Sequence, residues 1–97
     1  MYEFIQGKMV EKHPTHVVIE SQGIGFGLYV SLNTSAALKE EDCKLFTQLI
    51  VREDALLLYG FRDRDERAMF RNLIEVSGIG PNTAIVVLSD MTAEEVR

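Results

Sequence analysis

The most informative stretch of this chain is Leu73-Ile74-Glu75-Val76-Ser77-Gly78-Ile79-Gly80-Pro81-Asn82-Thr83-Ala84. Two glycines flank one apolar residue, so the backbone can turn tightly while Ile79 points inward as an anchor. Pro81 is well suited to the first position of a new helix, where a missing N–H removes no helical hydrogen bond. The stretch therefore predicts a hairpin between two helices.

The start of the second predicted helix is a candidate phosphate site. We expect the N–H groups of Gly80, Asn82 and Thr83 to point outward there, because the first turn of a helix has unpaired backbone donors and its dipole favours an anion. Backbone donors need little basic charge beside them. A simpler interpretation stays open, in which Gly78 and Gly80 merely cap the helices and Ile79 merely packs.

Helical periodicity begins at Asp63, which is a candidate N-cap. Glu66 can complete a capping box with it, and an apolar face predicts a helix that continues to about Val76. The second helix is expected from Pro81 to about Asp90. A third capping signature, formed by Thr92 and Glu95, predicts a further helix of which the chain holds only the first turns.

The preceding residues alternate between short extended runs and turns. Predicted strands cover residues 2–11, 16–20, 24–30, 44–51 and 56–61, with a short helical turn within 32–42. Gly25 and Gly27 lie on one face of the third predicted strand, which suggests a bend or a close backbone approach. The layout matches a small Greek-key barrel of the OB type. We therefore predict a mainly β plus α fold, with a barrel over residues 1–62 and an incomplete helical domain over residues 63–97.

Composition limits the classes of function. The chain has 97 residues, a hydrophobic share of 46% and a net charge of −5, which fits a small globular protein and argues against one that coats DNA through bulk positive charge. Residues 1–62 contain six Lys/Arg and eight Asp/Glu, and residues 63–97 contain four and seven, so neither half is basic. Any contact with DNA must be local.

Cofactor and metal chemistry find little support. Cys43 is the single cysteine, so no intrachain disulfide or cysteine-based zinc site is possible, and we expect it to be a buried, inert thiol. His13 and His16 flank a turn and are expected to be exposed polar residues rather than metal ligands. The chain has no glycine-rich phosphate loop followed by a lysine, so the sequence does not predict an ATPase centre. We expect no cofactor, no metal, no membrane segment and a cytoplasmic location.

Arg52-Glu53-Asp54-Ala55, between the fourth and fifth predicted strands, is the second candidate feature. Adjacent carboxylates at a hairpin tip repel phosphates and can keep two DNA strands apart. Simple solvation of a Glu-Asp turn is the alternative. Six aromatic residues could stack on bases as in single-strand-binding barrels, although we expect most of them in the core: Phe4, Phe26, Tyr29, Phe46, Tyr59 and Phe61.

Together these motifs resemble the RuvA family, the Holliday-junction-binding subunits of bacterial branch-migration complexes. The resemblance rests on several stretches in one order: Val51-Arg52-Glu53-Asp54-Ala55, Leu58-Tyr59-Gly60-Phe61, Glu66-Arg67, Phe70, Gly78-Ile79-Gly80-Pro81 and Leu88-Ser89, together with Gly23-Ile24-Gly25-Phe26. It implies an OB-type barrel, the first of two helix-hairpin-helix motifs, and a homotetramer around a fourfold axis.

The resemblance also implies roles for particular residues and partners. Glu53 and Asp54 would be the acidic pin near the junction centre, and Gly78, Ile79 and Gly80 would form the first DNA-gripping hairpin. The chain would be a non-catalytic subunit that targets the RuvB ATPase motor to four-way junctions, alongside the RuvC resolvase. The second hairpin and the domain that engages RuvB would lie beyond Arg97.

One position departs from the family pattern. Asn82 stands where we expect many relatives to carry a lysine, so one side-chain contact to phosphate is in doubt. Two other readings remain beside junction binding. The barrel could be a protein-interaction or assembly module whose hairpin only packs, or, more remotely, Glu53 and Asp54 could serve a nuclease.

Overall fold

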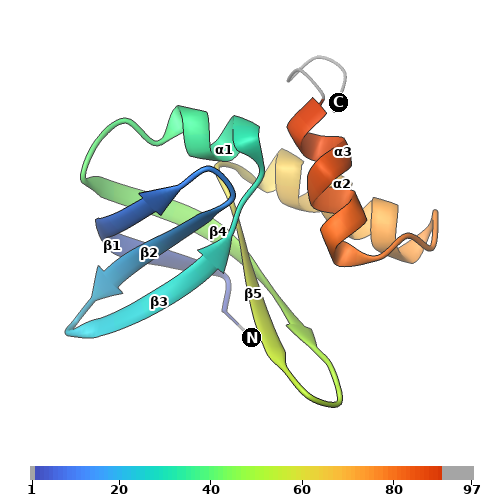
Figure 1. Ribbon diagram of the computed structural model, residues 1–97, viewed down its shortest axis with the longest axis horizontal. Coiled ribbons are helices and arrows are strands. Elements are labelled where there is room, and N and C mark those ends of the chain that lie inside the picture. The colour runs from blue at the N-terminus through green and yellow to red at the C-terminus, as the bar shows by residue number, and fades with distance from the viewer. Residues whose placement is uncertain (1, 91–97) are drawn as a thin grey trace.

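The structure, a computed structural model, describes residues 2–90 as a closed five-stranded barrel with a helical part beside it (Figure 1). The elements in chain order are β1 (Phe4–His13), β2 (His16–Ser21), β3 (Ile24–Tyr29), α1 (Leu32–Ala37), β4 (Asp42–Val51), β5 (Leu56–Phe61), α2 (Arg64–Glu75) and α3 (Pro81–Asp90). The strand order around the barrel is β1-β2-β3-β5-β4, and β3 with β5 is the parallel pair. This confirms the OB-type barrel followed by helices. The predicted helix start at Thr92 and Glu95 lies outside the described residues.

Strand β1 has the predicted length but lies two residues later than the predicted range of 2–11, and it pairs with two neighbours. Its first half pairs with β4, as in Phe4 with Phe46, and its second half pairs with β2 as far as His13 with His16. The same pairing explains why β4 begins at Asp42, opposite Lys8, two residues before the predicted start. Strand ends here are set by partners far away in the sequence.

The close backbone approach in the barrel occurs at Gly7 rather than at Gly25 or Gly27. A Cβ atom at Gly7 would collide with the carbonyl of Glu20, next to a register shift between β1 and β2. At Gly25 the nearest atom would be at an ordinary 3.6 Å, and at Gly27 a Cβ would press on the His16 ring at 3.1 Å. The predicted close approach therefore exists, but on β1, which β2 separates from β3.

Strand β5 is apolar throughout, and beyond the exposed Leu56 it is partly or fully buried on both faces. Leu58 packs against the barrel core, and a Cβ at Gly60 would already lie 3.0 Å from Leu28 and Leu45 inside the barrel. The alternate residues of β5 pack against the helices instead. These outward-facing residues are Leu57, Tyr59 and Phe61.

Two hydrophobic clusters result. The barrel cluster contains Ile5, Val17, Ile19, Leu28, Val30, Leu38 and Leu45. The second cluster, here called the helical core, joins β5 to α2 and α3 through Tyr59, Phe61, Phe70, Ala84, Ile85 and Leu88. Its members come from both sides of the boundary predicted between residues 62 and 63. That boundary stays a prediction.

The aromatic residues are less buried than expected. Tyr59 and Phe61 have no exposed surface, but Phe4 is 45% exposed and Tyr29 is 41% exposed. The other two, Phe26 and Phe46, are partly buried. Phe4 and Phe46 lie on the outside of the β1–β4 ladder, where the Lys44 ammonium sits 4.2 Å from the centre of the Phe4 ring. The expectation that most of the six belong to the core was wrong, because a small barrel has too little interior for them.

Candidate nucleic-acid interface

The connection between α2 and α3 is a tight turn at the surface. Val76 caps α2, and its N–H donates to the Asn72 carbonyl at 2.8 Å. Gly78 then adopts a φ of 72°, a left-handed conformation that favours glycine. The Ile79 N–H turns back to the Leu73 carbonyl at 3.3 Å, and the Ile79 side chain packs on the helical core. Ile79 thus anchors the turn from the inside while Gly78 stays exposed.

Gly80 serves the turn in a different way from Gly78. Its φ is not left-handed, and a Cβ atom built there would meet nothing within 4 Å. Neither backbone strain nor neighbouring atoms therefore require glycine at position 80. Its missing side chain leaves open space beside the first turn of α3.

That first turn presents backbone donors to solvent. Pro81 has no N–H, and the first helical hydrogen bond is donated by Ala84 to the Gly80 carbonyl at 2.9 Å. Within residues 2–90 no acceptor faces the N–H groups of Asn82 and Thr83, and both residues are exposed. A phosphate oxygen can reach these donors across the open space at Gly80. We call residues 78–83 the phosphate clip.

The side chain of Asn82 is tied to the barrel. The hydroxyl of Tyr59, on β5, donates to Asn82 Oδ1 at 3.1 Å. The Tyr59 ring is fully buried, with the rings of Tyr29 and Phe70 at 5.6 and 5.1 Å between centroids. This burial raises the pKa of the Tyr59 hydroxyl, which keeps it a donor. The amide oxygen of Asn82 therefore faces the protein rather than the solvent.

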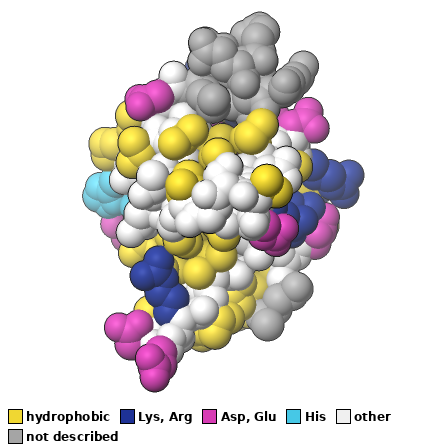
Figure 2. Space-filling model, turned by 90° about the vertical axis from the view of Figure 1, so that its right-hand side faces the viewer, with side chains coloured by type: hydrophobic (Ala, Val, Ile, Leu, Met, Phe, Trp, Pro, Cys, Tyr) yellow, Lys and Arg dark blue, Asp and Glu magenta, His cyan; other side chains and the backbone are white. Residues whose placement is uncertain are grey.

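The acidic pair lies at the far end of a protruding hairpin. Strands β4 and β5 extend beyond the barrel, and the Arg52 N–H donates to the Ala55 carbonyl at 2.8 Å to close the turn (Figure 1). Glu53 and Asp54 are exposed at this tip. Figure 2 shows acidic side chains gathered at the lowest point of the molecule, where this hairpin ends, with a basic side chain above them. We call residues 52–55 the acidic tip.

The acidic tip and the phosphate clip are attached to one core. Ile50 and Leu57 on the β4–β5 hairpin pack against the helical core, and Ile79 of the clip packs against the same cluster. Because protein interiors are close-packed, groups that share a core hold a defined relative position. The structure therefore places the two features at separate points of one unit.

The other end of α3 is tied to α1. The Leu32 N–H donates to Ser89 Oγ at 2.9 Å, and Asn33 Nδ2 donates to the Leu88 carbonyl at 2.6 Å. Helix α3 is thus held at its start by β5 and at its end by α1. Local sequence patterns give no sign of either attachment, since the partners are 23 and 55 or more residues apart.

Glu66 has a structural role beyond the predicted capping box. Asp63 caps α2, as predicted, by accepting from the Glu66 N–H at 2.8 Å. The Glu66 carboxylate, however, accepts from the hydroxyls of Ser31 and Thr34 and from the Arg62 N–H. It is 3% exposed. This carboxylate joins α2 to α1 instead of closing a reciprocal capping box.

Arg67 joins α2 to Thr47 on β4 and to Glu3, the residue before β1. Its guanidinium donates to the Glu3 carbonyl at 3.0 Å, to the Glu3 carboxylate at 2.9 Å and to the Thr47 carbonyl at 3.4 Å, and Arg67 is 6% exposed. The hydrogen bond from Arg67 is the main cause that lowers the pKa of the exposed Glu3 carboxyl. Adjacent Glu66 and Arg67 belonged to the recognised family pattern, but the pattern alone did not reveal that they bind the helices to the barrel.

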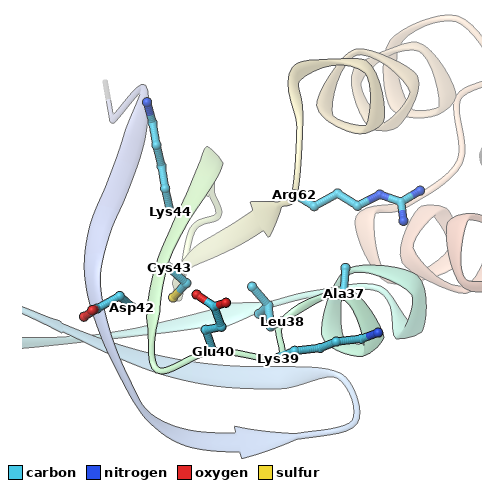
Figure 3. Close-up of a pocket in the computed structure, with 8 residues that line it drawn as sticks. All are labelled: Ala37, Leu38, Lys39, Glu40, Asp42, Cys43, Lys44 and Arg62. Carbon is cyan, nitrogen blue, oxygen red and sulfur yellow. The ribbon is translucent and has the colours of Figure 1, made fainter.

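A surface hollow of about 400 Å³ lies between the α1–β4 connection and β4. In Figure 3 the side chains of Lys44 and Arg62 extend in different directions, and Asp42 points away from Lys39. No set of polar groups converges on a common point. Cys43 lines the hollow and is partly buried rather than buried, and desolvation raises the pKa of its thiol. The arrangement gives no support for catalysis or ligand binding there.

Metal-binding side chains do not gather in the described part of the chain. Within residues 2–90 no three His, Cys, Asp or Glu side chains lie close enough to hold an ion. His13 is exposed beside Glu11 at 3.3 Å, and the partly buried His16 ring packs against Tyr29 at 5.1 Å. None of the helices in this range is both long and apolar enough to cross a membrane.

Comparison with known proteins agrees with this arrangement. The chain is 50% identical over 97 residues to a protein of Neisseria meningitidis serogroup C, 48% over 98 residues to one of Cytophaga hutchinsonii, and 43% over 93 residues to one of Serratia proteamaculans. Each is named Holliday junction branch migration complex subunit RuvA. The alignments cover 98%, 100% and 94% of this chain and 50%, 49% and 46% of the relatives. The chain spans about half the length of the curated relatives that it matches.

A family model agrees with these relatives and covers most of the barrel. The model described as RuvA N terminal domain matches residues 1–60, which end within β5. The relatives extend the similarity through the helices that carry the phosphate clip. This chain belongs to the RuvA N-terminal domain family.

Proposed function

We propose that this chain is a non-catalytic, structure-selective DNA-binding subunit that recognises four-way junctions. It binds the phosphate backbone through the amides of the phosphate clip, and it reads the shape of the junction rather than base sequence. The relatives' shared name, which refers to Holliday junction branch migration, supports this assignment.

One observation carries the proposal: the phosphate clip and the acidic tip are attached to the same core. The clip offers unpaired N–H groups in open space, which explains how a chain of net charge −5 can hold a phosphate without a basic patch. Glu53 and Asp54 repel phosphates at a second point and so keep strands apart near the junction centre. Attraction and repulsion at a set spacing suit a branched DNA better than a straight duplex.

Selectivity requires several copies. A single neutral clip is a weak site, whereas four clips in a homotetramer act together through high effective concentration. We propose that the subunits form such a tetramer on the four arms. The complex would target the RuvB ATPase motor to the junction through a segment beyond Arg97 and would work beside the RuvC resolvase. ATP hydrolysis would belong to the motor.

A gel-shift assay tests the proposal with the full-length protein that carries this sequence. We expect preference for a synthetic four-way junction over a linear duplex of the same length, and loss of that preference when Gly78 and Gly80 are both replaced by valine. Equal and negligible binding to both DNAs by the unaltered protein would refute junction recognition. Incubation with magnesium should leave the DNA intact, and cleavage would revive the nuclease interpretation.

A second candidate is an assembly module that binds protein rather than DNA. It is favoured by exposed apolar side chains on the hairpin, where Val51 is 68% and Leu56 is 70% exposed on paired positions. Such a pair beside the acidic tip is suited to a subunit contact. Sedimentation of the protein with and without four-way junction DNA distinguishes the two functions. A tetramer that does not bind the junction supports the assembly function alone.

A further inference from the structure

Strand β5 leads from the acidic tip directly to the phosphate clip. The turn at residues 52–55 ends at Ala55, and four residues later Tyr59 gives its hydroxyl to Asn82 in the clip. The ring of Tyr59 is fully buried, so the hydroxyl reaches the clip from inside the molecule. A residue of the tip-bearing hairpin thus holds the clip itself.

We propose that Tyr59 is a positioning residue that keeps the phosphate clip at a fixed distance and angle from the acidic tip. This inference rests on the proposed function and deepens it. Each subunit then carries two points of set spacing, one that attracts an arm phosphate and one that repels phosphates at the junction centre. Selectivity for a junction over a duplex depends on that spacing, because a duplex needs the clip but not the tip.

A hydrogen bond suits this task better than packing alone. Packing against the helical core sets the position of α3, but hydrophobic contact is not directional and restrains small rotations of the helix end less than a hydrogen bond does. The bond from Tyr59 to Asn82 fixes one end of α3, and the bonds from α1 to Leu88 and Ser89 fix the other. If the first bond is lost, α3 keeps its core contacts but its clip end gains freedom.

The bond also determines which part of Asn82 faces DNA. Because the Tyr59 hydroxyl donates to Oδ1, the Nδ2 group of the same amide is turned away from it. The exposed side chain of Asn82 then offers neutral N–H donors near the backbone amides of the clip. At the position where we expect a lysine in many relatives, this chain therefore has a neutral donor that a hydrogen bond holds in place, instead of a mobile charge.

Tyr59→Phe removes the hydroxyl and leaves the buried ring in place. Tyr29→Phe is the matched control, because Tyr29 stacks on Tyr59 but its hydroxyl makes no hydrogen bond to the clip. The first test needs no DNA. Spin labels at Glu53→Cys in the tip and Thr83→Cys in the clip, both exposed, report the distance between the two within one subunit, in a Cys43→Ser background and diluted with unlabelled protein.

We expect a broader distance distribution in Tyr59→Phe and an unchanged one in Tyr29→Phe. Distributions of equal width in all three proteins would overturn the inference, whether or not the protein binds DNA. Asn82→Leu, which removes the acceptor and leaves Tyr59 in place, should broaden the distribution in the same way. It keeps the test decisive if Tyr59→Phe fails to fold.

The second test measures DNA selectivity in the full-length protein. Tyr59→Phe should weaken junction binding by about threefold to tenfold, the range for loss of one neutral hydrogen bond, and should change duplex binding much less. In an Asn82→Ala background the same Tyr59→Phe change should have no further effect, since the partner is already absent. A lower melting temperature with an unchanged ratio of junction affinity to duplex affinity would mean that Tyr59 has only a structural role. Absence of junction preference in the unaltered protein would instead refute the proposed function and leave the distance measurement standing.

Discussion

Gly78 and Gly80 stand two residues apart, yet alanine should affect them in opposite ways. Gly78 has a φ of 72°, so Gly78→Ala forces a Cβ-bearing residue into the left-handed region, which costs about 1–2 kcal/mol of stability. A Cβ there would meet nothing within 4 Å, so no steric term adds to this cost. We expect the free energy of unfolding to fall by that amount alone.

At Gly80 neither the backbone nor the surroundings oppose a side chain. Its φ is not left-handed and a Cβ would again meet nothing within 4 Å. Gly80→Ala should therefore leave the folded state unstrained and stabilise it by about 0.4–1 kcal/mol, because alanine lowers the entropy of the unfolded chain. The new methyl group would, however, occupy the space through which we propose that a phosphate approaches.

Urea unfolding followed by circular dichroism gives both free energies, and melting curves offer a check at about 4–8 °C per kcal/mol for a domain of this size. Gel shifts with four-way junctions give the affinities. We expect the effects on stability and on DNA binding to differ: Gly80→Ala is stable but binds DNA more weakly, whereas Gly78→Ala is less stable. Equal destabilisation by both changes would refute the assignment of separate roles to the two glycines.

Three further predictions concern charged residues. Glu66→Leu should destabilise the fold by about 2–4 kcal/mol, since the buried hydroxyls of Ser31 and Thr34 and the Arg62 N–H lose their acceptor. Glu66→Gln keeps one carbonyl oxygen and should cost less. Equal losses of stability for the two variants in chemical denaturation would contradict this account. Because the pKa of the Glu3 carboxyl is lowered in the folded protein, its contribution to stability is present above the ordinary carboxyl pKa of 4.5 and is lost as the pH falls through the lowered value. Glu3→Gln should therefore reduce the loss of stability between pH 7 and pH 3. An identical pH profile in the variant would exclude the ion pair with Arg67 as the source of that loss. The double change Glu53→Gln and Asp54→Asn should shift the melting temperature by no more than about a degree or two, because both side chains are exposed. It should tighten junction binding by about threefold or more, because the repulsion between the tip and phosphates is lost. Unchanged affinity at low salt would mean that the tip lies away from DNA.

Local patterns were sufficient for most of the fold. Alternating apolar residues and turn residues predicted the five strands, and the Asp63 cap and Pro81 start marked the two helices within the described residues. These signals are short-range, because a cap or a turn depends on residues within one helical turn. The number and spacing of the elements also predicted the OB-type barrel, but not which strands pair around it, because those pairs join residues far apart in the sequence.

The attachments between elements could not be predicted in the same way. The hydroxyls that bind Glu66 belong to Ser31 and Thr34, which precede it by 35 and 32 positions. Tyr59 and Asn82 are 23 positions apart. A polar residue on a helix gives no local sign of such a partner, so the local pattern at Glu66 predicts only a capping box. Likewise, the glycine pattern predicts a close approach at Gly25 and Gly27, because the Glu20 carbonyl that requires glycine at Gly7 comes from another strand.

The two-sided burial of β5 has a consequence for how the chain folds. The helices complete their core only against Leu57, Tyr59 and Phe61, and those side chains take their positions only when β5 has joined β4 and closed the barrel. The clip therefore cannot reach its final geometry on a chain whose barrel is open. Amide hydrogens of β5 and α3 should exchange with solvent as one cooperative unit, and a half-folded subunit would have no competent grip on DNA with which to interfere at a junction.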